Sequence, residues 1–424
     1  MAVVLLAIVS GAFGAFGATA FREALFELER LLHGNAGHLV AAAQALSWWQ
    51  RVLFPCLGGI AAGIVLHLGA RWSGCGNRAE YLEAIALGHR RVDARSTLVR
   101  SSSSLISVAT GASIGREGAM VQVAVVAGHL LTRVIPATAQ EYRLVVACAA
   151  AAGLATAYNA PLASALFVGE VALGAQALPR LVPIVLAAIT GNAIAQLTFG
   201  AAPIFAADSL DIGSLWTAPA WIAVGAIGGG IAPIFVRLLG WAHDRFARMS
   251  ISLPLQLGLG GVLVGAMSVA EPRIWGNGYS VIDGLLHQPW TLPLLAQVLL
   301  LKVFATAATA GSGAVGGVFT PTLLVGACIG QMVGIGAQML VPGTVVGTPM
   351  AYAALGMGAL LAATTHAPMM AILMILEMTG HQSLTLPLAA ACMTGYLVAS
   401  AARSPSIYAE SLSRDVQPTS PDQG

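Results

Sequence analysis

The chain has 424 residues, of which 57% are hydrophobic and 9% charged, with a formal net charge of +2 and a mean hydropathy of +0.81. Soluble domains carry about 25% charged residues, so this composition excludes an ordinary soluble domain. We predict an all-α, multi-pass membrane protein with one transmembrane domain over residues 1–403 and a short cytoplasmic tail over 404–424. Its surroundings should be the lipid bilayer, and we expect no nucleic-acid partner.

The first predicted element is the apolar run from Ala2 to Ala20. We interpret it as a membrane helix and not as a signal peptide, because no basic segment precedes it and it is long enough to span a bilayer. Further apolar segments follow near 53–70, 102–115, 119–137, 143–155, 160–178, 181–198, 219–236, 255–271, 291–310, 314–341, 351–377 and 385–402. Several are too short to cross, and glycines and prolines interrupt them. Such breaks are tolerated at membrane depth only where they are buried in protein or line a wet cavity.

The connections between these segments differ in charge. Arginines gather in the 71–100 and 237–248 connections, whereas the 199–218 connection has no basic residue. Because short cytoplasmic loops carry an excess of basic residues, the first two should be cytoplasmic and the third should face outward. The five cysteines are scattered singly, so we expect neither a disulfide framework nor a metal site.

The chain repeats two of its motifs. The stretches 159–170 and 366–377 both read polar-Ala-Pro, then apolar residues, then glutamate, and they begin 207 positions apart. A second pair, Gly115-Arg-Glu-Gly-Ala119 and Gly317-Val-Phe-Thr-Pro321, is separated by 202 positions. In a membrane protein, two weakly similar halves with interrupted hydrophobic segments at matching places predict a transport site between the halves.

Glu117 is the outstanding candidate for chemistry. It lies in the glycine-rich stretch 110–118, which leads into the apolar run 119–131 and therefore indicates a loop that feeds a helix N-terminus. A charge at membrane depth is costly, so Glu117 should face a cavity or a partner. Unpaired amides at a helix N-terminus attract an anion, and a carboxylate placed there can occupy the anion site and leave it when protonated. The alternative is an N-terminal capping acid paired with Arg116.

The stretch 311–322 matches that segment in the other half, with flexible glycines followed by an apolar run. Its N–H groups are free to point at a ligand. A Walker-type phosphate loop would need Gly-Lys-Ser/Thr after the glycines, and Val318 and Phe319 stand there, so we exclude nucleotide binding. The alternative role for these glycines is close packing of helices.

Five motifs carry a resemblance to a known family. They are Gly115-Arg116-Glu117-Gly118, Gly317-Val318-Phe319-Thr320-Pro321, Asn159-Ala160-Pro161 with Glu170, Ala367-Pro368 with Leu376-Glu377-Met378-Thr379, and Pro405-Ser406-Ile407-Tyr408. Together they resemble the CLC chloride channels and proton/chloride exchangers, in the bacterial type that lacks regulatory CBS domains. The match runs over nearly the whole chain. Each motif is weak alone, but their order makes the resemblance specific.

The resemblance implies a homodimer in which each subunit encloses its own pore. Each pore is built from two repeats of opposite orientation, about 1–199 and 215–403, whose helix ends converge on a central anion. The implied function is transmembrane chloride transport, with chloride as the bound substrate, protons as a second partner, and no cofactor. A compact chain of this type fits a bacterial inner membrane.

The resemblance also assigns roles to residues. Glu117 would be the outer gate, which swings aside when protonated. The backbone amides of Val318 and Phe319 would bind the central chloride, and the hydroxyl of Tyr408 would close the site on its inner side. Neutral donors of this kind offset the lost hydration of an anion without trapping it. The other residues of the predicted anion-binding segments are Gly115, Arg116, Gly118 and Gly317.

Three positions depart from the family's pattern. The serine that usually coordinates the anion aligns with Gly76, so that hydroxyl ligand is missing unless Ser73 replaces it. The inner glutamate of the coupled exchangers aligns with Val171, immediately after Glu170, and valine cannot relay a proton. Ala119 stands where the family usually has a proline.

These departures bear on the mode of transport. Val171 favours channel-like or loosely proton-coupled chloride conduction. The alternative is strictly coupled proton/chloride antiport, with waters or Glu170 delivering the proton. Another small anion, such as fluoride or nitrate, is a more distant alternative because the serine is missing. We do not expect an enzyme, since the chain has no His-Glu-x-x-His zinc motif and no recognisable nucleophile setting.

Overall fold

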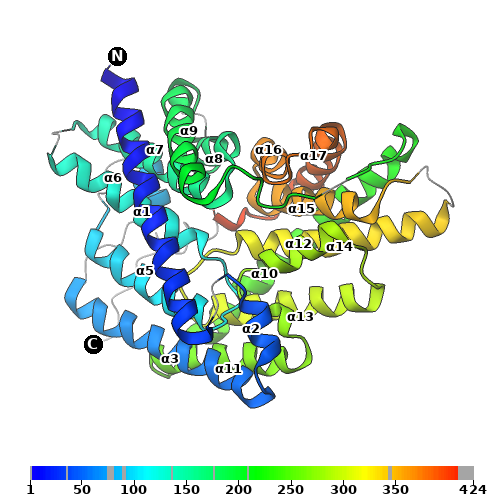
Figure 1. The fold of residues 1–424 in the computed structure, drawn as a ribbon, viewed down its shortest axis with the longest axis horizontal. Helices are drawn as coiled ribbons and strands as arrows, with labels where there is room; N and C mark the ends of the chain where they lie inside the picture. The colour runs from blue at the N-terminus through cyan, green and yellow to red at the C-terminus, as the bar shows by residue number, and fades with distance from the viewer. Residues whose placement is uncertain are drawn as a thin grey trace.

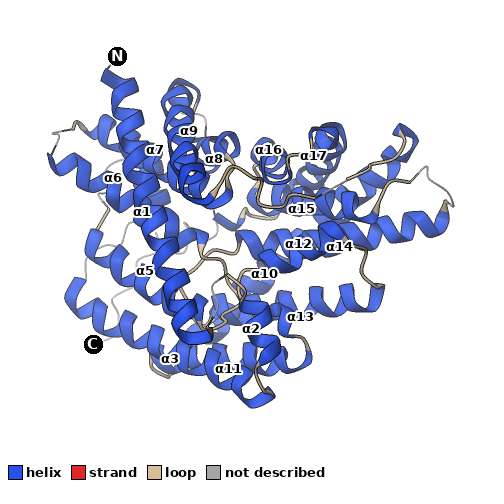
Figure 2. Ribbon diagram, viewed as in Figure 1, coloured by secondary structure: helices blue, strands red, loops and turns tan. Residues whose placement is uncertain are grey.

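The computed structural model describes residues 2–34, 37–73, 81–87, 92–134, 137–174, 177–207, 210–341 and 346–408. Within these ranges the chain forms helices joined by loops and turns, without a strand (Figure 2). The predicted all-α class is therefore confirmed. Gly76, with which the family's anion-coordinating serine aligns, lies outside the described residues. The tail from residue 409 onward lies outside them too.

The helices form two series with the same order of elements. The first series consists of α1 (Ala2–His33), α2 (Leu39–Ala45), α3 (Trp48–Ser73), α4 (Tyr81–Leu87), α5 (Ala94–Ala109), α6 (Glu117–Val134), α7 (Ala139–Tyr158), α8 (Pro161–Phe167), the π-helical turn η1 (Val168–Leu173), η3 (Leu178–Arg180) and α9 (Leu181–Phe199). The second consists of η4 (Leu215–Thr217), α10 (Ala218–Ala247), α11 (Leu253–Ala270), η5 (Pro272–Ile274), α12 (Tyr279–His287), α13 (Leu292–Gly311), α14 (Phe319–Leu340), α15 (Pro349–Thr365), α16 (Pro368–Thr379), η6 (Gln382–Leu384) and α17 (Thr385–Ala401). Apart from α2, every α-helix of the first series has a counterpart in the second.

Eight helices of the described chain are long and apolar enough to cross a membrane: α1, α3, α9, α10, α11, α13, α14 and α17. The apolar elements α8 with η1, α15 and α16 are shorter. The predicted apolar segment 351–377 divides into α15 and α16 because Pro368, which lacks an N–H, occupies the first turn of a new helix. A multi-pass protein with broken helices was predicted, and the structure confirms it.

The repeated motif has the same backbone in both halves. The residue that follows α7, Asn159, has φ 48°, and the residue that follows α15, His366, has φ 59°; this left-handed conformation is uncommon for residues other than glycine. In each half one alanine follows, and a proline then begins the next helix, at Pro161 in α8 and Pro368 in α16. The turn reverses the chain abruptly and so creates a short helix inside the protein.

The two short helices cap each other. The carboxylate of Glu377, near the end of α16, accepts hydrogen bonds from the N–H groups of Leu162 (3.0 Å) and Ala163 (2.9 Å) at the start of α8. In return Glu170, which follows α8, accepts one from the N–H of Met370 (3.2 Å) at the start of α16. α8 and α16 therefore run antiparallel, as repeats of opposite orientation require. Figure 1 shows them side by side, between α9 and α17.

Glycine allows the closest helix contact of the second half, between α14 and α15. A Cβ built on Gly330 would lie 1.9 Å from the carbonyl oxygen of Tyr352, and one built on Gly326 would lie 2.3 Å from that of Gly356. Small residues let helix backbones approach in this way within membranes. Gly336, further along α14, has open space where its Cβ would be.

Candidate functional site

The two glycine-rich segments meet at one glycine of each. The N–H of Gly115 donates to the carbonyl of Gly317 (2.6 Å), and the N–H of Gly317 donates to the carbonyl of Gly115 (2.9 Å). This antiparallel bridge joins residues 202 positions apart, one from each repeat. The bridge places the two glycine-rich segments side by side.

Two helices begin beside this bridge. α6 starts at Glu117 and α14 starts at Phe319, each two residues after its bridging glycine. Val318, at the N-cap of α14, provides no side-chain hydrogen bond to the first turn. The first N–H groups of an α-helix have no partner within the helix, and the helix dipole adds partial positive charge there. Such a terminus favours an anion.

Glu117 is buried, with 2% of its surface exposed. Its Oε1 accepts a hydrogen bond of 2.9 Å from Nδ2 of Asn277, a residue from the other repeat. Its Oε2 is buried without a hydrogen-bond partner in the part of the chain that the structure describes. Glu117 is therefore held by one oxygen only, and the other is available to an incoming proton or donor.

Arg116 does not form an ion pair with Glu117 within the described residues. Its guanidinium lies over the rings of Phe26 (5.1 Å) and Tyr279 (5.5 Å), where cation–π attraction holds it. The alternative of a simple Arg116–Glu117 pair is thus not what the structure contains. The guanidinium of Arg116 therefore packs on these two rings.

A cavity of about 290 Å³ runs beside Glu117. Residues from both repeats line it, and among them are the predicted site residues Glu117, Gly118, Gly317, Val318, Phe319 and Tyr408. Arg100 and His243 also line this cavity, and both line a second cavity of about 360 Å³ together with His67. His243 lies near the end of α10, in the stretch 237–248 whose arginines predict the cytoplasmic side; the structure shows this predicted connection to be the last turns of that helix. A path lined by basic groups therefore leads from that side toward Glu117.

Aromatic rings line part of the cavity of about 290 Å³ beside Glu117. Tyr158 and Phe319 have ring centroids 4.9 Å apart, and Phe167 lies 5.3 Å from Tyr408 in an edge-on arrangement. The hydroxyl of Tyr158 is 3.3 Å from that of Thr320. Sequence reasoning found Phe319 and Tyr408 but missed Tyr158 and Phe167, because both rings look like ordinary core residues until the cavity is seen.

The predicted proton residues lie elsewhere. Glu170 and Val171 are in η1 and are not among the residues that line the cavity beside Glu117. The carboxylate of Glu170 is used to cap α16 through Met370. Val171 packs partly buried against the hydrophobic core.

These features define an integral membrane protein with opposed repeats, in which the uncapped start of α14 and the buried carboxylate of Glu117 lie beside one cavity. The chain belongs to the voltage-gated chloride channel family, whose model matches residues 58–400.

Its relatives agree over nearly the full length. The chain is 48% identical over 409 residues to the putative chloride channel protein ClcB-like of Ralstonia nicotianae. The aligned region covers 96% of this chain and 95% of that protein. It is 39% identical over 409 residues to the voltage-gated ClC-type chloride channel ClcB of Escherichia coli, with 95% and 97% covered.

Two solved structures have the same fold. A slow cyanobacterial Cl⁻/H⁺ antiporter superposes with a TM-score of 0.84 at 25% identity, covering 97% of each chain. A CLC-type fluoride/proton antiporter gives a TM-score of 0.77 at 21% identity, covering 96% of each chain. Because the fluoride/proton antiporter is only 21% identical, its likeness to this chain concerns the fold alone.

Proposed function

We propose that Glu117 gates a chloride pathway that runs through the 290 Å³ cavity of each subunit. One observation carries this proposal: a buried carboxylate lies at the start of α6, beside the bridge that joins the two repeats, and lines the cavity. When charged, this carboxylate competes with chloride for the positive helix ends. When protonated, it loses that attraction and can move aside.

The same geometry supports our assignment of the anion ligands. The backbone amides of Val318 and Phe319 are placed at the uncapped start of α14, and both residues line the cavity. The hydroxyl of Tyr408 is the further donor that we assign to the anion. Amide and hydroxyl donors replace water without adding a full positive charge, so chloride is bound weakly enough to leave.

We infer channel-like or loosely coupled conduction, and keep strict proton/chloride antiport as the alternative. Val171 cannot carry a proton, and the carboxylate of Glu170 is engaged with the backbone of α16. The fold shared with a Cl⁻/H⁺ antiporter supports the alternative. In that case the proton would have to travel along the chloride path itself or through water.

We also propose that the protein forms a homodimer in a bacterial inner membrane. The outer faces of α9 and α17 expose large apolar side chains, including Leu197 (90% exposed) and Leu397 (60% exposed). These faces would meet in a twofold interface between two complete pores. Crosslinking in membranes that yields only monomers would contradict this assignment.

The deciding experiment is chloride flux from liposomes that contain the purified protein. A chloride gradient is imposed, potassium and valinomycin clamp the voltage, and external pH is recorded. Chloride release without uphill proton movement supports channel-like conduction. Proton movement against its gradient, driven by chloride, establishes antiport. Absence of chloride flux in both wild type and Glu117→Gln would overturn the proposed function itself.

A further inference from the structure

We propose that Asn277 is the latch that holds the gate carboxylate of Glu117 closed, and that Lys302 positions this latch. The proposal rests on the gating role assigned to Glu117 above. It concerns a residue that approaches Glu117 from the second repeat, 160 positions away in the sequence. Asn277 is a positioning residue and not an anion ligand.

The orientation of the Asn277 amide is fixed by its two partners. Its Oδ1 accepts the N–H of Tyr279 (3.2 Å), so its Nδ2 is the end that points to Glu117 (2.9 Å). A carboxamide oxygen can only accept and its nitrogen can only donate, so the reverse orientation would lose both contacts. Asn277 therefore presents a donor to the carboxylate.

The bond between Glu117 and Asn277 separates two cavities. Glu117 lines the cavity of about 290 Å³ that also reaches Arg100 and His243. Asn277 lines a smaller cavity of about 50 Å³, together with Arg116 and Glu29. Neither of the two bonded residues lines both cavities. Breaking this hydrogen bond is thus the local event that would join them.

The smaller cavity lies on the predicted outer side. α3 crosses from Trp48 to the connection that is predicted to be cytoplasmic, so the chain just before α3 lies on the opposite side. Gly37, which belongs to that preceding stretch, lines the smaller cavity. The latch consequently closes the pathway toward the outside.

The turn that carries Asn277 is flanked by glycines with positive φ, Gly276 (67°) and Gly278 (102°), so it needs external support. Lys302 supplies it: Nζ donates to the carbonyls of Ile274 (3.0 Å) and Gly276 (2.7 Å). Lys302 is the chain's only lysine and is fully buried. A buried ammonium is costly unless its N–H groups are hydrogen-bonded, and these two carbonyls accept from it.

Lys302 belongs to a polar stripe on α13. Thr306 and Thr309 follow at helical spacing and face the same way. Oγ1 of Thr309 accepts the N–H of Ser113 (3.2 Å), and the hydroxyl of Thr306 is 3.4 Å from that of Ser113. Ser113 lies in the loop just before Glu117. One helix face therefore fastens both the loop of the gate and the turn of the latch.

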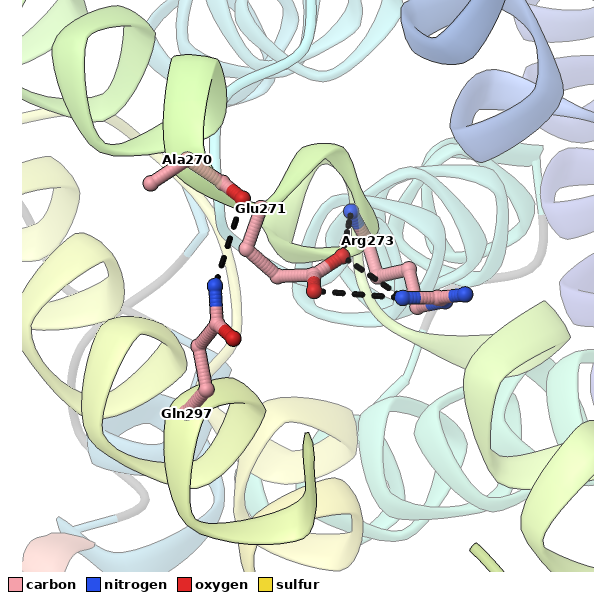
Figure 3. Close-up of polar contacts among 4 residues, drawn as sticks. All are labelled: Ala270, Glu271, Arg273 and Gln297. Carbon is pink, nitrogen blue, oxygen red and sulfur yellow. Dashed lines mark hydrogen bonds and ion pairs between the residues drawn. The ribbon is translucent and has the colours of Figure 1, made fainter. Parts of the chain in front are cut away.

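The start of the same turn is anchored independently of the gate. Figure 3 shows Glu271 bonded to Arg273, with both carboxylate oxygens 3.1 Å from Nη1, and Nε2 of Gln297 donating to the carbonyl of Ala270 (3.2 Å). Gln297 is exposed, lies on α13 as Lys302 does, and does not reach Glu117. It provides a matched control, an amide that supports the same segment but not the gate.

Protonation should weaken the latch. An N–H donor binds a charged carboxylate about twice as strongly as a neutral group, so the bond favours the deprotonated, closed state. Other charged or titratable groups surround Glu117 and Arg116: Arg22 and Glu29 of α1, Tyr158 of α7, Tyr279 of α12, Lys302 of α13, and Tyr408. None of these is altered by changing Asn277.

The test is chloride flux from liposomes at pH 7.5 and 4.5 with Asn277→Ala and with Asn277→Leu, which has nearly the same shape as asparagine but neither a donor nor a charge. We expect flux at pH 7.5 to rise about tenfold, because a hydrogen bond to a charged group contributes about one to two factors of ten. Flux at pH 4.5 should change little, so the pH dependence flattens. Gln297→Ala should behave as wild type. Lys302→Met should shift the profile in the same direction.

A Glu117→Gln background separates the two proposals. There, adding Asn277→Ala should have no further effect on the pH profile. If Glu117→Gln keeps the wild-type pH dependence, the gate assignment fails. If Glu117→Gln loses it but both Asn277 variants match wild type, the latch is overturned while the gate stands. If Lys302→Met does not yield monodisperse protein, the two Asn277 variants alone still test whether Asn277 holds Glu117.

Discussion

Gly115 and Gly317, one from each repeat, are hydrogen-bonded to each other through both of their N–H groups, at 2.6 and 2.9 Å. This contact fixes the starts of α6 and α14 relative to each other. Since it uses only backbone atoms, the geometry around Glu117 does not depend on the packing of bulky side chains at that point. The bridge also leaves no room for one: a Cβ on Gly115 would lie 2.1 Å from Oε2 of Glu117 and 2.8 Å from the carbonyl of Gly317.

Gly115→Ala should therefore disturb Glu117, the residue that we propose as the gate. The added methyl group displaces the carboxylate of Glu117 and presses on a backbone oxygen that cannot move freely. We expect a loss of about 1–3 kcal/mol in stability, typical of overpacking, and an altered pH profile of chloride flux. Gly230→Ala is the control, because its Cβ would meet no heavy atom within 4 Å. Equal behaviour of the two variants in thermal unfolding and flux would refute the steric argument.

Glu117→Gln should abolish the pH dependence of chloride flux. The amide has nearly the shape of the carboxylate but cannot change its charge, so the competition with chloride at the helix ends no longer varies with pH. Flux measured in liposomes between pH 4.5 and 7.5 should be level. A pH profile that keeps its wild-type slope would remove Glu117 from the gating role.

Tyr408→Phe should weaken chloride binding. The substitution removes one hydroxyl donor and leaves the ring that packs against Phe167. Loss of a hydrogen bond of about 1 kcal/mol corresponds to roughly a fivefold weaker affinity, measurable by titration calorimetry. Tyr396→Phe is the control, since that ring contacts His366 and does not line the cavity. An unchanged affinity for chloride would make Tyr408 a bystander.

Gly330→Ala should destabilise the protein more than Gly336→Ala, although both glycines are in α14. The first change places a methyl group 1.9 Å from the carbonyl of Tyr352, whereas the second enters open space. Overpacking costs about 1–3 kcal/mol or more, while alanine without a clash stabilises a helix by up to about 1 kcal/mol. Thermal unfolding in detergent gives the order of stability, and a reversed order would contradict the packing account.

Much of the fold could be predicted from repetition. The offsets between 159–170 and 366–377 and between the two glycine-rich segments indicated two halves, and the structure shows matching backbone at Asn159 and His366. The position of Glu117 at a helix start also followed from glycines preceding an apolar run. Local patterns of this kind are visible because a few adjacent residues determine them.

The latch could not be predicted in the same way. Gly276-Asn277-Gly278 reads as an ordinary turn, because asparagine between glycines is typical of turns, and nothing in the sequence links it to Glu117. Lys302 gave a stronger signal, as a lone lysine within an apolar segment, but its partners are backbone carbonyls that no pattern reveals. Ser73 and Gly76 bear on the missing hydroxyl ligand; Gly76 and the side chain of Ser73 are outside the described residues.

The exchange of caps between α8 and α16 has a consequence for how the protein is made. Until Glu377 is synthesised, the N–H groups of Leu162 and Ala163 lack their carboxylate, so the first half leaves the ribosome incomplete. Two half-length chains packed as a symmetric pair would cap each other in the same way, with the glutamate of each copy accepting hydrogen bonds from a helix start of the other. The repeats of this single polypeptide thus relate to each other as subunits do, since each completes the start of a helix in the other.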